Sequence, residues 1–149
     1  MVSSPKEQNQ AEFAAALEEL WRAVLRATGR GVPGGETELT LSQYFVMDAM
    51  ADQALTVSEV ARAARVAVPT ATRALRGLET RGFVDRERNE AADRRLVTVA
   101  LTPAGRAVLD EKRTWVHERQ REIFEGLSAP ERRTVTRALA TIAHNIEEL

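Results

Sequence analysis

Residues 55–101 contain two short helical patterns separated by a very short turn, and this spacing leaves few possible folds. Only residues 65–67 lie between the two patterns, so the chain must reverse sharply there, and Pro69 suits the first turn of the second helix. The apolar residues that recur at helical spacing are Val57, Val60, Ala61 and Ala64 in the first pattern, and Ala71, Ala74, Leu75 and Leu78 in the second. The stretch therefore predicts a helix-turn-helix.

The second predicted helix has an outer face that is small and hydroxylated at its start and basic further along. When the apolar stripe is buried, the residues left outside are Val68, Pro69, Thr70, Thr72, Arg73 and Arg76. Such a face can enter the major groove of DNA, where Thr and Arg reach base edges and phosphates. The pattern alone is equally compatible with an ordinary helix pair whose arginines are solvated.

A strand-like hairpin follows the helix pair. Residues 83–88 and 96–101 have the pattern of two strands, and residues 89–95 form a polar tip that carries Arg94 and Arg95 side by side. A basic hairpin beside a recognition helix can insert Arg into a narrow minor groove, where the negative potential is concentrated. The hairpin therefore favours DNA binding over a solvated helix pair.

The chain resembles the multiple antibiotic resistance regulator (MarR) family of winged helix-turn-helix transcription factors. The matching stretches are LTLSQYFVMDAM, VPTATRALRGLETRGFVDR, the tip residues DRR and LTPAGRAVL, and the resemblance covers residues 10–149. It implies a mostly α fold of the α+β class, with a two-stranded wing and a helical dimerisation region built from the N- and C-terminal helices. It also implies a homodimer that binds pseudo-palindromic double-stranded DNA, most often as a repressor.

The resemblance assigns roles to the wing residues. By match, Asp93 pairs with an arginine and braces the tip, Arg94 contacts phosphate, and Arg95 enters the minor groove. Arg88, just before the tip, belongs to the same expected DNA-binding set. A solvated hairpin tip is the alternative interpretation.

The chain departs from the family pattern where the recognition helix begins. Ala67 stands where a capping Ser is common, and Val68 stands where an Arg is common. The missing cap costs about 1 kcal/mol of helix stability. A small apolar side chain at position 68 suits a thymine methyl group, so base preference does not transfer from other family members.

Apolar stripes at helical spacing occur at both ends of the chain. Residues 1–9 are polar and expected to fray, after which the first helix carries Phe13, Leu17 and Leu20 and ends near Thr28. The last helix, preceded by a Ser128–Glu131 capping box, has a heptad-like seam of Val135, Leu139, Ile142, Ile146 and Leu149. The seam fits packing within the chain or, as the resemblance implies, dimerisation.

Between these ends, Thr102 and Pro103 are expected to begin a long helix. We therefore expect three parts: residues 1–36 as an N-terminal dimerisation helix and loop, residues 37–102 as the winged helix-turn-helix, and residues 103–149 as C-terminal dimerisation helices.

A small aromatic or anionic ligand is implied by the resemblance, bound between the DNA-binding and dimerisation parts. Candidate residues are those expected where the first and second helices meet: Trp21, Arg22, Tyr44, Phe45 and Met47. For the aromatic and Met cluster, ordinary core packing is the alternative.

Composition limits the other classes of function. The chain has no cysteine and two histidines, and it contains no Gly-rich phosphate loop or nucleophile elbow, so we expect no enzyme, metal site or cofactor. No apolar run is long enough to span a bilayer and the start does not resemble a signal peptide, so a cytoplasmic protein is expected.

Charge is distributed unevenly along the chain. The formal net charge is −1, but residues 57–95 hold nine arginines against six acidic residues, a local charge of +3. Residues 1–56 hold four basic against eight acidic residues, a local charge of −4. A charge of +3 is small for one DNA-binding surface, which favours a dimer that doubles the phosphate contacts. A helical module whose charged hairpin contacts another protein remains the alternative function.

Overall fold

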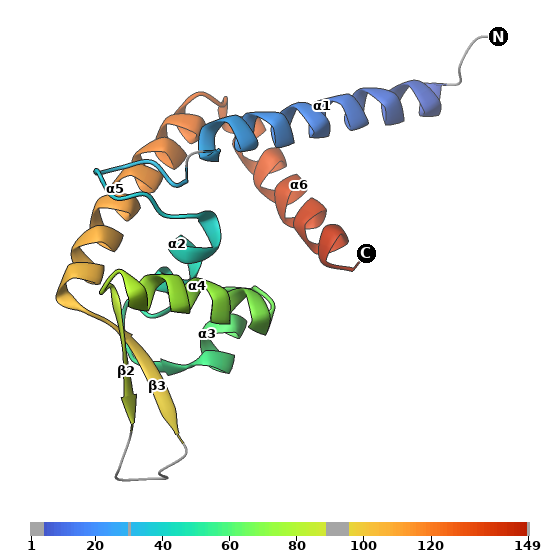
Figure 1. Ribbon diagram of the computed structural model, residues 1–149. Coiled ribbons are helices and arrows are strands. Elements are labelled where there is room, and N and C mark those ends of the chain that lie inside the picture. Colours follow the sequence, from blue (N-terminus) through green and yellow to red (C-terminus); the bar gives the residue numbers. More distant parts are fainter. Residues whose placement is uncertain (1–4, 30, 89–95, 149) are drawn as a thin grey trace. The chain divides into compact units, whose positions relative to one another are not determined.

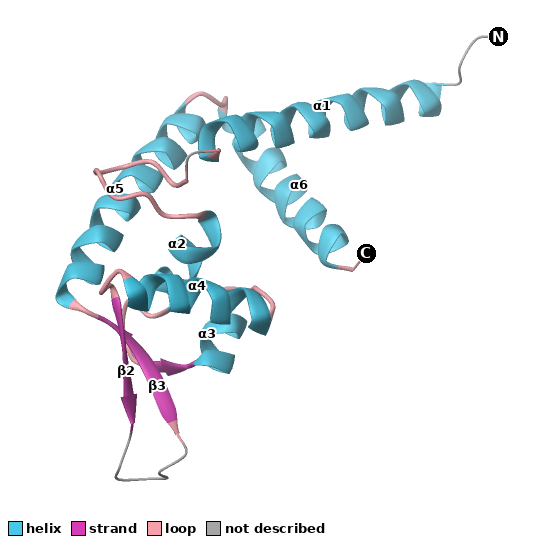
Figure 2. Cartoon of the chain, in the orientation of Figure 1, coloured by secondary structure: helices cyan, strands magenta, loops and turns pink. Residues whose placement is uncertain are grey.

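The computed structural model describes residues 5–29, 31–88 and 96–148 (Figure 1). Its elements in chain order are α1 (Pro5–Thr28), α2 (Leu41–Ala49), β1 (Leu55–Thr56), α3 (Val57–Ala63), α4 (Val68–Thr80), β2 (Val84–Arg88), β3 (Val97–Leu101), α5 (Pro103–Glu125) and α6 (Ala129–Glu147). The chain divides into two compact units, Met1–Lys112 and Arg113–Leu149, with the boundary inside α5. The six helices and small antiparallel sheet of the described residues confirm the predicted fold class (Figure 2).

The core of the first unit lies where α2, α3 and α4 pack together and α4 contacts β2. Its fully buried side chains come from every one of these elements and from β3, and include Val46, Met47, Val60, Leu75, Leu78, Val84 and Val99. Both stripes predicted for the helix-turn-helix contribute to this core. The apolar periodicity of the sequence therefore identified the buried faces of α3 and α4 correctly.

The sheet has three antiparallel strands in the order β1-β3-β2, one more than the predicted two-stranded wing. Strands β2 and β3 form the wing, with Val84 opposite Leu101 and Arg88 opposite Val97. The added strand, β1, pairs Leu55 with Val99. A strand of two residues has no periodicity of its own, so only its pairing with β3 identifies it.

Capping side chains fix the starts of several helices. The expected Ser128–Glu131 box is present, and Thr102 accepts a hydrogen bond from the Gly105 N–H at 3.0 Å, which confirms the start of α5. A further box, not expected from the sequence, begins α3, where the Thr56 backbone N–H donates to the Glu59 carboxylate at 2.7 Å.

These caps depend on charged carboxylates. The hydrogen bond from the Thr56 backbone lowers the pKa of Glu59, and hydrogen bonds from Ser128, chiefly its side chain, lower the pKa of Glu131. A carboxylate whose pKa is lowered on folding stabilises the protein above its ordinary pKa. That contribution is lost as the pH falls through the lowered value. Both caps therefore hold at neutral pH.

The start of α1 corrects one expectation. Residues 5–9 are helical rather than frayed, because α1 begins at Pro5. Proline suits the first turn of a helix, and Glu7 in that turn is favourable for the helix dipole. The polar composition of residues 5–9 is therefore that of a solvated first turn of helix.

In the second unit, the end of α5 contacts α6 through Arg132. Its guanidinium lies 4.3 Å from the centre of the Phe124 ring, and its Nε donates a hydrogen bond of 3.0 Å to the Phe124 carbonyl. A cation over an aromatic face is attracted by the ring quadrupole. This contact holds the connection between the two helices.

Gly105 allows α5 to begin tightly against the turn before β2. Thr102 bonds to this turn twice, through its backbone N–H to the Phe83 carbonyl at 3.1 Å and through its hydroxyl to the Gly82 carbonyl at 2.7 Å. A methyl group at Gly105 would collide with the Phe83 backbone carbonyl. A larger residue at position 105 would therefore push α5 away from the wing.

We predict that Gly105→Ala lowers the free energy of unfolding by roughly 1–3 kcal/mol, the usual cost of overpacking a close contact. Gly126→Ala is the matched control, because an added methyl there finds its nearest atoms at 3.5 Å, an ordinary contact distance. Urea denaturation followed by circular dichroism measures both variants. Equal stability of Gly105→Ala and the wild type would contradict this account of the junction.

Candidate nucleic-acid interface

Helix α4 separates a buried side from an exposed side as its sequence predicts. Ala71, Ala74, Leu75 and Leu78 are buried in the core. Of the six residues expected on the outer face, Val68, Pro69, Thr70, Arg73 and Arg76 are exposed, and Thr72 is half-buried. The structure thus places all six on the side that the core leaves accessible.

The turn between α3 and α4 closes through the backbone. Ala64 caps α3, Arg65 takes a left-handed conformation with φ of 53°, and the Val66 N–H donates to the Ala61 carbonyl at 3.0 Å. This is the hydrogen-bond pattern of a Schellman motif, in which a left-handed residue ends a helix. The motif produces the sharp reversal predicted for residues 65–67.

Helix α4 begins without a side-chain cap. Ala67 occupies the N-cap position and makes no side-chain hydrogen bond, as its methyl group dictates. Val68 follows as the first helical residue with 49% of its surface exposed. Helix α4 therefore begins with an uncapped Ala67 and an exposed Val68, at the two positions where the sequence departs from the family pattern.

A salt bridge connects the wing to the recognition helix. Arg86 on β2 and Glu79 near the end of α4 lie 2.7 Å apart, measured from Nε to Oε1, and both side chains are partly exposed. An exposed pair of this kind contributes at most about 1 kcal/mol to stability. Its geometric effect is to hold β2 beside α4. This pair was not expected from the sequence, because no local pattern relates a helix end to a strand position.

Of the four wing residues expected to contact DNA, the structure describes one. Arg88 is exposed at the end of β2 and lies opposite Val97 in the strand register. Asp93, Arg94 and Arg95 lie outside the described residues.

The five expected ligand residues fall into two environments. Met47 is fully buried and Tyr44 is 7% exposed within α2, with the Tyr44 ring edge-on to Phe45 at 5.5 Å between centroids. Phe45 is exposed. On α1, Trp21 is exposed and Arg22 pairs with Glu18 at 2.8 Å. Tyr44 and Met47 thus have the environment of ordinary core residues.

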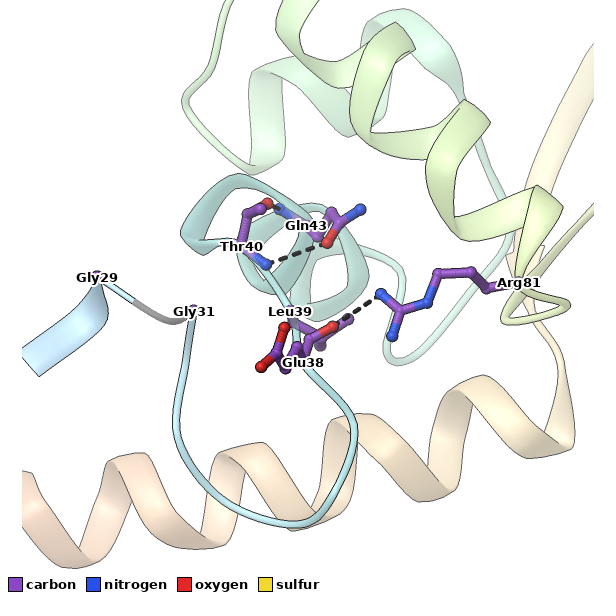
Figure 3. Close-up of a pocket in the computed structure, with 7 residues that line it drawn as sticks. All are labelled: Gly29, Gly31, Glu38, Leu39, Thr40, Gln43 and Arg81. Carbon is purple, nitrogen blue, oxygen red and sulfur yellow. Dashed lines mark hydrogen bonds between the residues drawn. The ribbon is translucent and has the colours of Figure 1, made fainter.

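An open cavity of about 600 Å³ lies beside the start of α2 (Figure 3). Its lining residues, none of which belongs to the expected ligand set, are Gly29, Gly31, Glu38, Leu39, Thr40, Gln43 and Arg81. Arg81, just after α4, donates a hydrogen bond of 2.7 Å to the Glu38 carbonyl. The Thr40 N–H donates to the Gln43 side chain at 3.0 Å. A guanidinium and an amide beside one hollow can orient a small polar ligand.

The loop that forms this cavity is tied to α5 as well as to α4. Lys112 is the one buried charged side chain among the described residues, and its ammonium group donates to the Gly34 carbonyl. Burial lowers the pKa of Lys112. Together with Arg81, it fixes residues 31–40 between two helices. No pattern in the sequence indicated this role, because Lys112 lies in a long polar stretch of α5.

Two other kinds of feature are missing from the part of the chain that the structure describes. Among residues 5–29, 31–88 and 96–148, no helix is long and apolar enough to cross a membrane. Within the same residues, no three His, Cys, Asp or Glu side chains are grouped so that they could hold a metal ion.

Comparison with known proteins identifies a family model and several solved structures that are similar to this chain. Residues 37–96 match the model of the MarR family. Among solved structures, Bordetella bronchiseptica BpsR, whose DNA binding is regulated by 6-hydroxynicotinic acid, is 26% identical with a TM-score of 0.69, and the match covers 89% of this chain and 98% of BpsR.

Two structures in complex with DNA share the fold. Streptococcus pneumoniae FabT is 22% identical with a TM-score of 0.70, over 95% of this chain and 98% of FabT. Lactococcus lactis ZitR is 18% identical with a TM-score of 0.65, over 89% of this chain and 97% of ZitR. Residues 37–96, which include the helix-turn-helix and strand β2 of the wing, therefore match a domain of the MarR family of transcription regulators.

Proposed function

We propose that this protein is a homodimeric repressor that binds pseudo-palindromic operators and is released from them by a small aromatic or anionic ligand. The exposed face of α4, in a domain that matches the MarR family, is the observation that carries the proposal. The residues that would contact DNA are those of this face together with Arg88 and the wing-tip residues Asp93, Arg94 and Arg95.

The α4 face has the chemistry of a major-groove reader. Its first turn is small and carries the Thr70 hydroxyl, and Arg73 and Arg76 follow on the exposed side. Arginine makes bidentate contacts to guanine and also reaches phosphates, while small residues let a helix approach the base edges. DNA complexes of FabT and ZitR, which share the fold, support this use of the surface. The alternative of a protein-interaction module has no comparable support.

Exposed apolar residues support the dimer. None of the described residues of α1 or α6 is buried. Phe13 and Leu20 on α1 are 53% and 46% exposed, and Leu139 and Ile146 on α6 are 49% and 46% exposed. On each helix, several large apolar side chains exposed to this extent are typical of an interface. We therefore retain residues 1–36 and 103–149 as dimerisation parts, with Leu17, Val135, Ile142 and Leu149 completing the proposed contact set.

A ligand response is supported by the regulation of BpsR by 6-hydroxynicotinic acid and by the cavity beside α2. Two arginines are candidates to receive an anion: Arg22, chosen from the sequence, and Arg81, which lines the cavity. A ligand must prefer the conformation that does not fit DNA, because only a difference in affinity shifts an equilibrium.

The test of DNA binding uses Arg73→Ala and Arg95→Ala. Arg73→Ala should cost roughly 1–3 kcal/mol of binding free energy and relax discrimination at one major-groove position per half-site. Arg95→Ala should weaken binding most at operators with A·T-rich flanks. Each change that removes a phosphate or minor-groove contact should flatten the salt slope by about two units per dimer. Fluorescence anisotropy on operator variants at several salt concentrations measures these effects.

Arg121→Ala is the matched control for these variants, because it removes an exposed arginine of α5 that pairs only weakly with Glu125 at 3.8 Å. Its affinity and salt slope should equal those of the wild type. If the wild type and all three variants bind every duplex equally, the α4 face and the wing tip are solvated charge and the DNA-binding proposal is wrong.

For the dimer, Ile142→Asp with Ile146→Asp should give a monomer or an unfolded chain, because two carboxylates would be buried without partners. Thr141→Asp with His144→Asp adds the same groups on the opposite side of α6 and should leave a dimer. Sedimentation velocity at micromolar concentration distinguishes these states. A monomeric wild type under those conditions would rule out the seam as a dimer interface.

For the ligand, salicylate should raise the apparent Kd for operator DNA. Arg22→Ala should weaken that response if the sequence-based site is correct, and Arg81→Ala should weaken it if the ligand occupies the cavity beside α2. Each variant is titrated with salicylate at a fixed fraction of bound DNA. Coincident titration curves for the wild type and both variants would contradict both sites.

A further inference from the structure

The first residue of the recognition helix is an exposed aliphatic side chain. Val68 is 49% exposed, and the residues on either side of it, Ala67 and Pro69, are exposed and apolar as well. The core does not require this valine, since the buried stripe of α4 consists of Ala71, Ala74, Leu75 and Leu78. An apolar tip on an otherwise polar and basic face requires an explanation.

The position of Val68 determines what it can meet. In helix-turn-helix proteins the N-terminal residues of the recognition helix contact base edges in the major groove. Val68, Thr72 and Arg76 are spaced four residues apart and therefore form one row along α4. Because Val68 is the first residue of that row, it lies at the end of the helix that contacts base edges in helix-turn-helix proteins.

The isopropyl group then discriminates among the bases. All four bases present hydrogen-bonding groups in the major groove, but only thymine also presents a methyl group there. A valine pressed against the polar groups would displace water without replacing its hydrogen bonds, which is unfavourable. Against the thymine methyl it buries apolar surface on both partners, which is favourable.

We propose that Val68 is a specificity-determining residue that selects a thymine in each operator half-site through contact with the 5-methyl group. This inference rests on the proposed function, and it specifies one base of an operator that is otherwise unknown. Ala67 contributes by its small size, because a capping side chain at that position would extend from the same tip of the helix.

The experiment begins with selection of an operator from random duplex DNA by the full-length protein. Each thymine of the operator is then replaced in turn by uracil, which removes only the 5-methyl group and leaves base pairing unchanged. At one thymine per half-site, removal of the methyl should weaken wild-type binding about fourfold, the value of one buried methyl-sized group. Replacing that thymine by 5-methylcytosine should preserve more affinity than replacing it by cytosine.

Val68→Ala makes the assignment specific. This variant should bind the thymine operator more weakly than the wild type, and its response to uracil at the same position should fall below about 1.5-fold, as expected when a double-mutant cycle removes both partners of one contact. Val57→Ala, at a half-buried valine that begins α3, is the control and should keep the fourfold response. Since Val68 is exposed, thermal unfolding should show that Val68→Ala remains folded.

The outcomes distinguish this inference from the proposed function. If the wild type binds the operator and loses affinity with Arg73→Ala, but no uracil substitution weakens binding more than about twofold, the role of Val68 is wrong and the repressor proposal stands. A fourfold uracil effect that persists in Val68→Ala would assign the methyl contact to another residue. If no duplex is selected at all, both proposals are wrong.

Discussion

Burial of one side of α4 sets the arrangement of the DNA-binding part. The buried residues of α4 are Ala71, Ala74, Leu75 and Leu78, and this helix contacts α2, α3 and β2. Because a helix has only one angular setting that buries this stripe, the same packing determines which side chains are presented outward. The exposure of Arg73 and Arg76 thus follows from the core.

Polar contacts then fix the neighbours of this helix. Arg86 on the wing pairs with Glu79 of α4. Arg81 donates a hydrogen bond to the Glu38 carbonyl, in the loop that lines the open cavity. Lys112 holds the same loop from α5 through the Gly34 carbonyl. The loop is therefore connected to the end of the recognition helix on one side and to α5 on the other. A ligand that competes for Arg81 would act directly on a contact of α4.

The missing cap and the exposed valine at the start of α4 have a common explanation. A capping hydroxyl at Ala67 would stabilise the helix by about 1 kcal/mol, and a polar residue at position 68 would be better solvated. Functional surfaces commonly depart from the residues that stability alone would favour. An apolar side chain at the start of α4 is unfavourable in water, whereas its contact with a thymine methyl group is favourable. The proposed role of Val68 therefore explains why the start of α4 is less stable than a capped helix would be.

Periodicity and cap residues were enough to predict the two helices of the helix-turn-helix, their buried faces, the turn before Val68 and the start of α5 at Pro103. These signals act over a few neighbouring positions, so they can be read along the chain. Three features became visible only once the domain was folded: the strand formed by Leu55 and Thr56, the pairing of Arg86 with Glu79, and the burial of Lys112 against a distant loop. Such contacts join separate elements, and their geometry depends on how the whole domain packs rather than on any local pattern.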